Sequence, residues 1–561
     1  MMSDNKNNII LEEYKNEFLY EKSKTNLNIE FNRVAFIFFV FLIISAIYSI
    51  QLLHLGSLKI DSENKPLITK KNFRADIIDR NGNYLVKTVS SINIGINPIE
   101  VIDKKKLLIN LQLIFPNKDY IDILNKLNKN KFFYLEKKIS ADNYEKIMSL
   151  GDKSIKSEEK LTRIYPHKNL FSHIIGQIDD DNKGISGIEK SFDEKLKQIK
   201  EPLQLSVDTD IQFLIREELI KYNSIFKSKG STAILMNVNN GEIISMVSYP
   251  DFDLNKRETV NDVNFINRAT KGVYELGSVF KTFTVAAGLE EDLIEIDTKF
   301  FNLEKRLKCG KNIISEYDNK IPSELTVEQI LIRSGNIGSV RIGQKLEIDK
   351  LKLFLEKIGV LSKIDFDIEE VGEPIPFRWG KCKLATVSFG HGITTTPLQL
   401  AKGYAIISNG GFEINPSLIK KNLENNQKQK RIIKKGVSEQ INKILRKIVT
   451  TKEGTAGLAN IEGYEVGGKT GTAEKVIVGG YTRKAKVNTF ASIFPTSKPN
   501  YVLIILLDEP KTSEDYIYKY KNKNGSHKGT PFNTAGWTSV EVAGKIIQKI
   551  GPILATKYIE N

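Results

Sequence analysis

One uninterrupted apolar segment dominates the pattern of hydrophobic and polar positions in this 561-residue chain. Residues 34–53 read VAFIFFVFLIISAIYSIQLL and carry no charge. About 20 apolar residues in a helix match the hydrocarbon thickness of a bilayer. A cleaved signal peptide is the alternative, but no small-residue cleavage site follows Leu53. We therefore predict an uncleaved single-pass transmembrane anchor at 34–53, preceded by a tail of residues 1–33.

The charges around this anchor leave its orientation open. Five Lys or Arg residues lie within residues 1–33, and five more lie between His54 and Arg74. The positive-inside rule relies on an excess of such residues on the cytoplasmic side. The orientation must therefore be inferred from function.

Short alternating apolar and polar runs follow the anchor and predict β-strands. The segment Arg74–Pro98 contains two such runs around Asn81-Gly82, which is a strong signal for a β-hairpin. Helical periodicity takes over between Lys104 and Leu150. We predict one extended, mostly β module over residues 54–200.

The remaining residues, 201–561, predict an α+β domain. A strand and an amphipathic helix follow Leu203, and two core strands flank a turn within Ser231–Pro250. Tyr501–Pro510 is apolar throughout its first half, as expected of a buried strand. The chain closes with apolar residues at helical spacing: Val542, Ala543, Ile546 and Ile550. Helices gathered around an antiparallel sheet give this fold class.

Composition adds little to this picture, but the net charge of +15 raises the question of nucleic-acid binding. The densest basic cluster lies between Lys421 and Lys435 and has no aromatic residues that could stack on bases. We interpret it as a solvated surface hairpin and expect no nucleic-acid partner. The charge also favours proximity to an anionic membrane or wall polymer.

Cysteine and histidine usage gives no framework for a metal or a disulfide network. The two cysteines, Cys309 and Cys382, are too few to show from spacing whether they pair. The five histidines have no metal-ligand spacing relative to one another or to the cysteines. We expect neither a metal site nor an organic cofactor.

The first candidate catalytic motif is Ser278-Val279-Phe280-Lys281, which precedes an apolar helical stretch. A lysine three residues after a serine lies on the same helix face, and it can activate the hydroxyl if burial and a neighbouring cation favour its neutral form. A serine that opens a helix also presents an unpaired N–H to an oxyanion. An exposed lysine on a core helix is the alternative, and the S-x-x-K pattern recurs at Ser3, Ser62, Ser157, Ser224 and Ser417.

Two further motifs follow in the same predicted domain. Ser334-Gly335-Asn336 is either a helix cap or a proton relay (Ser334) beside an amide (Asn336) that binds the substrate backbone. Lys469-Thr470-Gly471-Thr472 is either an edge strand with a bulge or a carboxylate-binding strand. A glycine inside a strand often marks close approach of another backbone. Strand alternation puts Lys469 and Gly471 on one face, so twist or a bulge must orient the remaining groups.

The order of the three motifs is more informative than any one of them. Ser278, Ser334 and Lys469 are separated by 56 and 135 residues, and this triple is the signature of penicillin-binding proteins and class A β-lactamases. The chain resembles a class B penicillin-binding protein, most closely the septal cell-division peptidoglycan D,D-transpeptidases of the FtsI family. The resemblance extends through RADIIDRNG, RIYPHKN, HIIGQID, GISGIEKSFDEKL, NRATKGVYELGSVFK, FGHGITTTPLQLAKGYAIISNGG, GKTGTAEK and the TAGW stretch near the C-terminus. Departures from the family pattern are Ala75, Asn237, Leu276 and Gly335.

This resemblance implies a fold and a set of roles. It implies a penicillin-binding transpeptidase domain with a serine β-lactamase-like fold, a preceding pedestal or dimerisation-like module, and one transmembrane helix. Ser278 would be the nucleophile, Lys281 its base and Ser334 the relay to the leaving D-alanine. Backbone N–H groups of Ser278 and Thr472 would form the oxyanion hole. The substrate would be bound by Asn336, Lys469, Thr470, Gly471 and Thr472.

The resemblance also implies partners and a location. Peptidoglycan stem peptides would be the substrates, and β-lactam antibiotics would be covalent inhibitors. A polytopic septal glycan polymerase and other divisome proteins would be partners in the membrane. The chain would lie in the bacterial inner membrane, with residues 1–33 cytoplasmic and the catalytic domain periplasmic.

Several alternatives remain open at this point. An elongation-type class B transpeptidase shares the motifs, and a non-catalytic divisome scaffold would share the architecture. A β-lactamase needs a deacylating base, for which the chain has no class A-type glutamate motif. A β-lactam sensor needs a cytoplasmic signalling segment longer than 33 residues. The intact set of motifs favours an enzyme.

Overall fold

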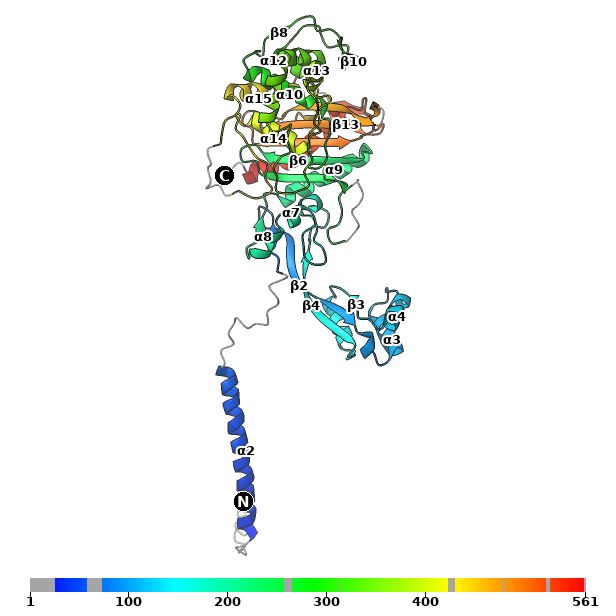
Figure 1. The fold of residues 1–561 in the computed structure, drawn as a ribbon, viewed down its shortest axis with the longest axis vertical. Helices are drawn as coiled ribbons and strands as arrows, with labels where there is room; N and C mark the ends of the chain where they lie inside the picture. The colour runs from blue at the N-terminus through cyan, green and yellow to red at the C-terminus, as the bar shows by residue number, and fades with distance from the viewer. Residues whose placement is uncertain are drawn as a thin grey trace, which may run out of the picture. The chain divides into compact units, whose positions relative to one another are not determined.

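The computed structural model describes residues 26–57, 73–256, 265–310, 312–421, 429–477, 480–520 and 525–558. The chain divides into two compact units, residues 1–71 and residues 72–561 (Figure 1). Most of the tail predicted at residues 1–33, and the centre of the basic surface hairpin predicted at Lys421–Lys435, lie outside the described residues.

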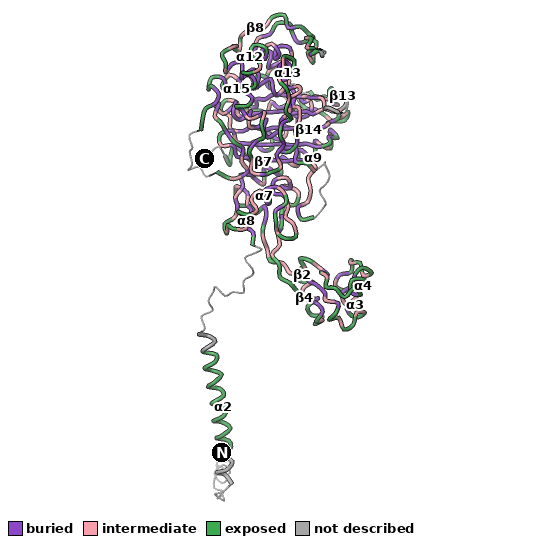
Figure 2. Tube along the Cα trace, viewed as in Figure 1, coloured by how far each residue is buried: buried purple, intermediate pink, exposed green. Residues whose placement is uncertain are grey.

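The first unit contains helix α2 (Asn26–Ser57). Its segment Arg33–Leu53 is long and apolar enough to cross a membrane, with a mean hydropathy of 2.5. Every residue in this segment is exposed, as its green colour in Figure 2 shows. Exposed apolar residues along a whole helix are expected of a helix surrounded by lipid.

The second unit begins with the predicted hairpin. Strand β1 (Ile77–Ile78) pairs antiparallel with β2 (Tyr84–Ile96), and the turn between them contains Gly82 at φ +90°. The hairpin at Asn81-Gly82 is therefore confirmed. Strand β2 also pairs antiparallel with β3 (Phe133–Glu136) and β4 (Ile155–Ile164) of the same five-stranded sheet. Strand β5 (Leu203–Gln204) pairs parallel with β1.

Three short helices pack against the β2–β3–β4 end of this sheet around a small core of their own. Each begins at a residue whose side chain accepts hydrogen bonds from the free backbone N–H groups of the first turn, which stabilises the helix start. These N-cap residues are Asp103, Asp119 and Ser140. The helices are α3 (Lys104–Ile114), α4 (Tyr120–Asn128) and α5 (Ala141–Met148).

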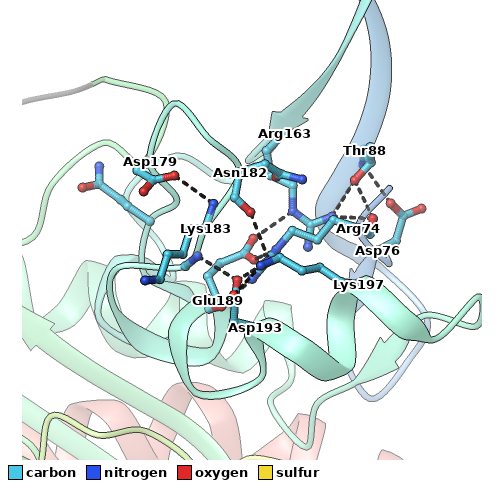
Figure 3. A network of polar contacts seen from close by, with 12 residues as sticks. Arg74, Asp76, Thr88, Arg163, Asp179, Asn182, Lys183, Glu189, Asp193 and Lys197 are labelled. Carbon is cyan, nitrogen blue, oxygen red and sulfur yellow. Dashed lines mark hydrogen bonds and ion pairs between the residues drawn. The ribbon is translucent and has the colours of Figure 1, made fainter. Parts of the chain in front are cut away.

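The other end of the sheet is fastened by a buried ionic network (Figure 3). Arg74, which is fully buried, donates through Nε to Glu189 Oε2 at 2.5 Å and through Nη1 to Asp193 Oδ1 at 2.6 Å. Arg163 of β4 donates to the second oxygen of Glu189 at 2.9 Å. The Glu189 carboxylate thus pairs with two guanidinium groups, and Asp193 supplies the second negative charge. Glu189 and Asp193 come from α7 (Gly187–Ser191) and α8 (Asp193–Gln198).

The largest hydrophobic core joins this end of the pedestal to the C-terminal domain. Ala75, Ile77 and Leu196 belong to the same buried cluster as the strands of the C-terminal sheet. Packing therefore does not separate the chain at residue 200. The domain boundaries at residues 54, 201 and 561 stay predictions.

The C-terminal domain is built on a five-stranded antiparallel sheet, ordered β12–β13–β14–β6–β7. Every residue of the central strand β14 is buried, so both faces of the sheet are covered. The predicted core strands around the turn at Gly241 and the predicted strand after Tyr501 are confirmed. The strands are β6 (Gly230–Asn237), β7 (Ile243–Tyr249), β12 (Gly467–Ile477), β13 (Gly480–Phe494) and β14 (Tyr501–Asp508).

Two groups of helices pack on this sheet. Helices α9 (Thr209–Ile225) and α16 (Ser539–Tyr558) contact each other and the sheet. Helix α14 (Pro397–Ser408) contacts β6, β13 and β14 and belongs to a second group. That group includes α10 (Phe280–Glu290), α11 (Val327–Ile332), α12 (Asn336–Lys357) and α15 (Lys435–Thr450). This arrangement is the predicted α+β fold.

The region between α10 and α12 contains two short strand pairs, one of which is linked to a helix by a disulfide. Strand β9 (Arg306–Cys309) pairs with β10 (Asn312–Ser315), and β8 (Lys299–Phe300) pairs with β11 (Leu325–Thr326). Cys309 and Cys382 form a disulfide, which answers the question that their spacing left open. The bond ties β9 to helix α13 (Lys381–Val387).

Candidate active site

The candidate nucleophile, Ser278, lies where the chain enters a helix from a loop. It occupies a 3₁₀ turn, Gly277–Val279, that continues directly into α10. Gly277 has φ +64°, and a Cβ at this position would lie 2.9 Å from the carbonyl oxygen of Thr472. Glycine is therefore required for the serine turn to approach β12 so closely.

Lys281 lies one helical turn beyond Ser278 and is completely buried. Its Nζ donates to the Ser334 carbonyl oxygen at 2.5 Å, to Ser334 Oγ at 3.1 Å and to Asn336 Oδ1 at 2.7 Å. Burial lowers the pKa of Lys281 to about 7, while the charge of Glu316 acts in the opposite direction. A substantial fraction of this amine is therefore neutral near neutral pH, as a general base requires.

Ser334 occupies the junction between helices α11 and α12. Its backbone is left-handed, at φ +58°, which is uncommon for a residue other than glycine and is often found at functional sites. Its hydroxyl lies between two lysines, because Lys469 Nζ donates to Ser334 Oγ at 2.8 Å and Lys281 Nζ does so at 3.1 Å. The sequence-predicted relay serine therefore touches both basic side chains of the site.

Lys469 comes from β12, the edge strand of the sheet. It is completely buried, and burial lowers its pKa well below the ordinary value, with the charge of Lys281 acting in the same direction. A Cβ at Gly471 would lie 2.1 Å from the carbonyl oxygen of Leu276. The close backbone approach expected at this glycine is confirmed, and it occurs against the segment that carries Ser278.

The two threonines of the Lys469–Thr472 motif in β12 are held by neighbouring segments. Thr470 Oγ1 lies 2.7 Å from Thr455 Oγ1, and Thr472 Oγ1 accepts a hydrogen bond from the Ala535 N–H at 2.9 Å. The register shift in β12 lies between Glu474 and Lys475, after the motif. These contacts, rather than a bulge within the motif, hold the threonine side chains.

The structure therefore brings together every residue that the sequence proposed for the site. Among the described residues, Ser278 Oγ makes no hydrogen bond to Lys281, whose Nζ is directed to Ser334 and Asn336. Catalytic hydrogen bonds of this kind commonly tighten only when the substrate is bound. The arrangement supplies a serine, a buried base and a second hydroxyl within one cluster, which suits acyl transfer.

Three residues at the site were missed by sequence reasoning. Glu316 accepts the backbone N–H of Asn336 at 2.7 Å, and Thr455 and Ala535 hold the β12 threonines. Glu316 and Thr455 lie outside any motif, so no local pattern could have marked them. Ala535 belongs to the segment Thr534–Trp537, which carries the family resemblance near the C-terminus.

Within the part of the chain that the structure describes, no group of three or more His, Cys, Asp or Glu side chains could hold a metal ion. The prediction that the site uses neither a metal nor an organic cofactor is not tested by this observation and stays a prediction.

Family models match two successive parts of the chain after the apolar helix. The penicillin binding protein transpeptidase domain matches residues 231–529, and the penicillin-binding protein dimerisation domain matches residues 69–218. The first of these matches contains all the candidate site residues.

Individual proteins match over most of the chain. A probable peptidoglycan D,D-transpeptidase FtsI of Caulobacter vibrioides is 31% identical over 501 residues, which cover 86% of this chain and 82% of the relative. Stage V sporulation protein D of Bacillus subtilis is 30% identical and covers 78% of this chain and 74% of the relative. A crystal structure of penicillin binding protein 3 from Mycobacterium tuberculosis, complexed with aztreonam, has the same fold, with a TM-score of 0.64 at 20% identity and coverage of 86% and 97%.

Proposed function

Because the chain belongs to the class B penicillin-binding proteins of the FtsI type, we propose a specific role for each residue of its site. The protein is a serine-type peptidoglycan D,D-transpeptidase of septal cell-wall synthesis. Its substrates are peptidoglycan stem peptides, and β-lactams bind the same domain. The observation that carries the assignment of roles is the buried amine of Lys281, one helical turn from Ser278 and in contact with Ser334.

In the proposed reaction, Ser278 Oγ attacks the carbonyl carbon of the D-Ala-D-Ala bond and Lys281 takes the hydroxyl proton. The backbone N–H groups of Ser278 and Thr472 hold the resulting oxyanion. This is supported by the contact of Gly277 with Thr472, which places the two backbones side by side. Ser334 passes a proton to the nitrogen of the leaving D-alanine, and the peptide stays on Ser278 as an ester.

The acyl group then passes to an amine of a stem peptide on a neighbouring peptidoglycan strand, and this transfer regenerates the serine hydroxyl. Lys469, Thr470 and Thr472 bind the terminal carboxylate of the donor peptide, and Gly471 allows their strand to lie against the nucleophile. Asn336 binds the peptide backbone by exchanging one of the contacts that its amide makes in the free protein.

We place the chain in the inner membrane, with residues 1–33 in the cytoplasm, the anchor at 34–53 and the catalytic domain in the periplasm. The proposed substrate lies outside the cytoplasm, which supports this orientation. The disulfide between Cys309 and Cys382 supports it, because such bonds persist in oxidising compartments and are rare in the cytosol.

We further propose that the pedestal, residues 54–200, recruits a polytopic septal glycan polymerase and other divisome proteins. The exposed side chain of Lys87 on the Arg74–Pro98 hairpin offers a test. The change Lys87→Glu should weaken recruitment of a division partner, measured by co-purification from membranes. Unchanged recruitment after charge reversal along this hairpin would count against the proposal.

The enzymatic assignment is tested with the full chain in detergent. A stem pentapeptide ending in D-Ala-D-Ala serves as donor and a D-amino acid as acceptor, and mass spectrometry follows the exchange product. We expect exchange by the wild-type chain and none by Ser278→Ala. Exchange that persists in a folded Ser278→Ala chain would contradict the role of Ser278.

A further inference from the structure

Glu316 lies directly after strand β10 and is bound to the start of helix α12. Its Oε2 accepts the backbone N–H of Asn336 at 2.7 Å, and its Oε1 accepts that of Ile337 at 2.9 Å. The N-cap residue of α12 is Gly335, which has no side chain to perform this function. Two free N–H groups of the first turn are therefore satisfied by a carboxylate from a distant segment.

Ser315, the residue before Glu316, binds the side-chain amide of Asn336. The carbonyl oxygen of Ser315 accepts a hydrogen bond from Asn336 Nδ2 at 2.8 Å. Backbone and side chain of Asn336 are thus both fixed by two consecutive residues, and its Oδ1 is left to accept from Lys281 at 2.7 Å. The orientation of an amide that contacts the base depends on this short segment.

The carboxylate also acts on the base through its charge. The charged groups that face Lys281 are Glu316, from the segment after β10, and Lys469, from β12, while Ser334 and Asn336 contribute neutral acceptors. Glu316 raises the pKa of Lys281, against the lowering caused by burial. A helix start beside a carboxylate is also electrostatically favourable.

We infer that Glu316 is a positioning residue for the transpeptidase reaction: its carboxylate caps helix α12 and thereby holds Asn336 against the Lys281 amine. This inference rests on the proposed role of Ser278 and Lys281. Glu316 does not touch the reacting atoms. It acts by fixing Asn336 and by setting the charge next to Lys281.

The test is the rate at which a fluorescent penicillin acylates the full chain in detergent, measured across pH 5 to 9 for Glu316→Gln. Glutamine keeps one acceptor oxygen but directs an NH₂ group at the second backbone N–H. We expect the rate plateau to fall about tenfold to a hundredfold, because small displacements of catalytic groups have effects of that size. The acid limb of the pH profile, where the acylation rate rises with pH, should move to lower pH. The reason is that a charge that favours the ammonium form of Lys281 is removed.

Glu324→Gln is the matched control, since Glu324 is an exposed carboxylate in the same segment between β10 and α11. It should leave both the plateau and the acid limb unchanged. A residue that only stabilised the fold would change the folded fraction without moving the acid limb. A Glu316→Gln chain with the wild-type rate and limb would overturn the inference.

Glu316→Asp keeps the experiment decisive if the glutamine variant fails to fold. Aspartate retains the charge on a side chain that is one methylene shorter. We expect an acid limb near that of the wild type and a rate several-fold lower than the wild type. A rate equal to that of the wild type would overturn the inference, whereas a wild-type chain that takes no label at all would overturn the proposed function itself.

Discussion

Two buried lysine side chains meet at the hydroxyl of Ser334. Lys281 Nζ and Lys469 Nζ donate to Ser334 Oγ at 3.1 and 2.8 Å, and both side chains are completely buried. Two ammonium groups this close to one oxygen repel each other, and each is separated from water. The site therefore favours a neutral amine next to Ser278. A neutral amine can accept the proton of the serine hydroxyl, which an ordinary surface lysine at neutral pH cannot do.

The pH dependence of acylation follows from the pKa of Lys281, which burial lowers to about 7. The reactive form is the neutral amine, so the acylation rate should rise as the pH increases and reach half its plateau near pH 7. Stopped-flow measurements with a fluorescent penicillin check this. The Lys281→Arg variant, which stays protonated, should be slower by about a hundredfold or more. A rate independent of pH between 6 and 8 would contradict this role.

At the level of secondary structure, the site depends on how closely one edge strand approaches one helix start. Strand β12 and the turn Gly277–Val279 contact each other through two glycines, Gly277 and Gly471. A Cβ atom at Gly277 or Gly471 would lie 2.9 Å or 2.1 Å, respectively, from a backbone carbonyl oxygen of the other segment. This backbone contact sets the distance between the Ser278 and Thr472 N–H groups that we propose as the oxyanion hole.

The change Gly471→Ala should disrupt this contact. The new Cβ would lie 2.1 Å from the carbonyl oxygen of Leu276, so one of the two backbones must move. We expect a loss of about 1–3 kcal/mol in the free energy of unfolding, together with slower acylation. Thermal melting and penicillin labelling measure the two effects.

Gly436→Ala is the control for that change, because a Cβ at Gly436 in helix α15 meets no atom within 4 Å. It should leave acylation unchanged and should not lower the melting temperature, since alanine favours a helix more than glycine does. Equal melting temperatures and rates for Gly471→Ala and the wild type would contradict the importance of the contact.

Local patterns in the sequence predicted the parts of the fold that depend on local physics. The Asn81-Gly82 turn and the buried strand after Tyr501 are found where their patterns indicated. The pairing of Cys309 with Cys382 and the cap that Glu316 provides join residues distant in the chain. A lone carboxylate before a Ser-Gly-Asn motif has no pattern of its own, because its role exists only after the β9–β10 hairpin has formed.

At the scale of the whole molecule, the larger hydrophobic core and a buried ionic network connect the parts of the second unit. The core includes residues from both the pedestal and the C-terminal sheet. The network joins Arg74, just after the anchor unit, to β4 and to helices α7 and α8. Arg74 is thereby bound to the two helices that precede the C-terminal domain.

Glu189→Gln should strongly destabilise this unit. The change removes the carboxylate that pairs with both Arg74 and Arg163 and leaves two buried guanidinium groups with one charge partner fewer each. We expect the free energy of unfolding to fall by about 3–5 kcal/mol. Chemical denaturation of the full chain in detergent measures it. The exposed carboxylate of Glu194 provides the control, and Glu194→Gln should change stability by less than about 0.5 kcal/mol. Similar effects of both changes would contradict a special role for the network.

The most direct test of this account is the site of covalent attachment. The full chain is treated with penicillin, and peptide mass spectrometry locates the adduct, with Ser278→Ala as the comparison. We predict one penicilloyl group on Ser278 and none on the folded variant. An adduct on another residue, or a folded wild-type chain that takes no adduct, would contradict the assignment of Ser278 as the nucleophile.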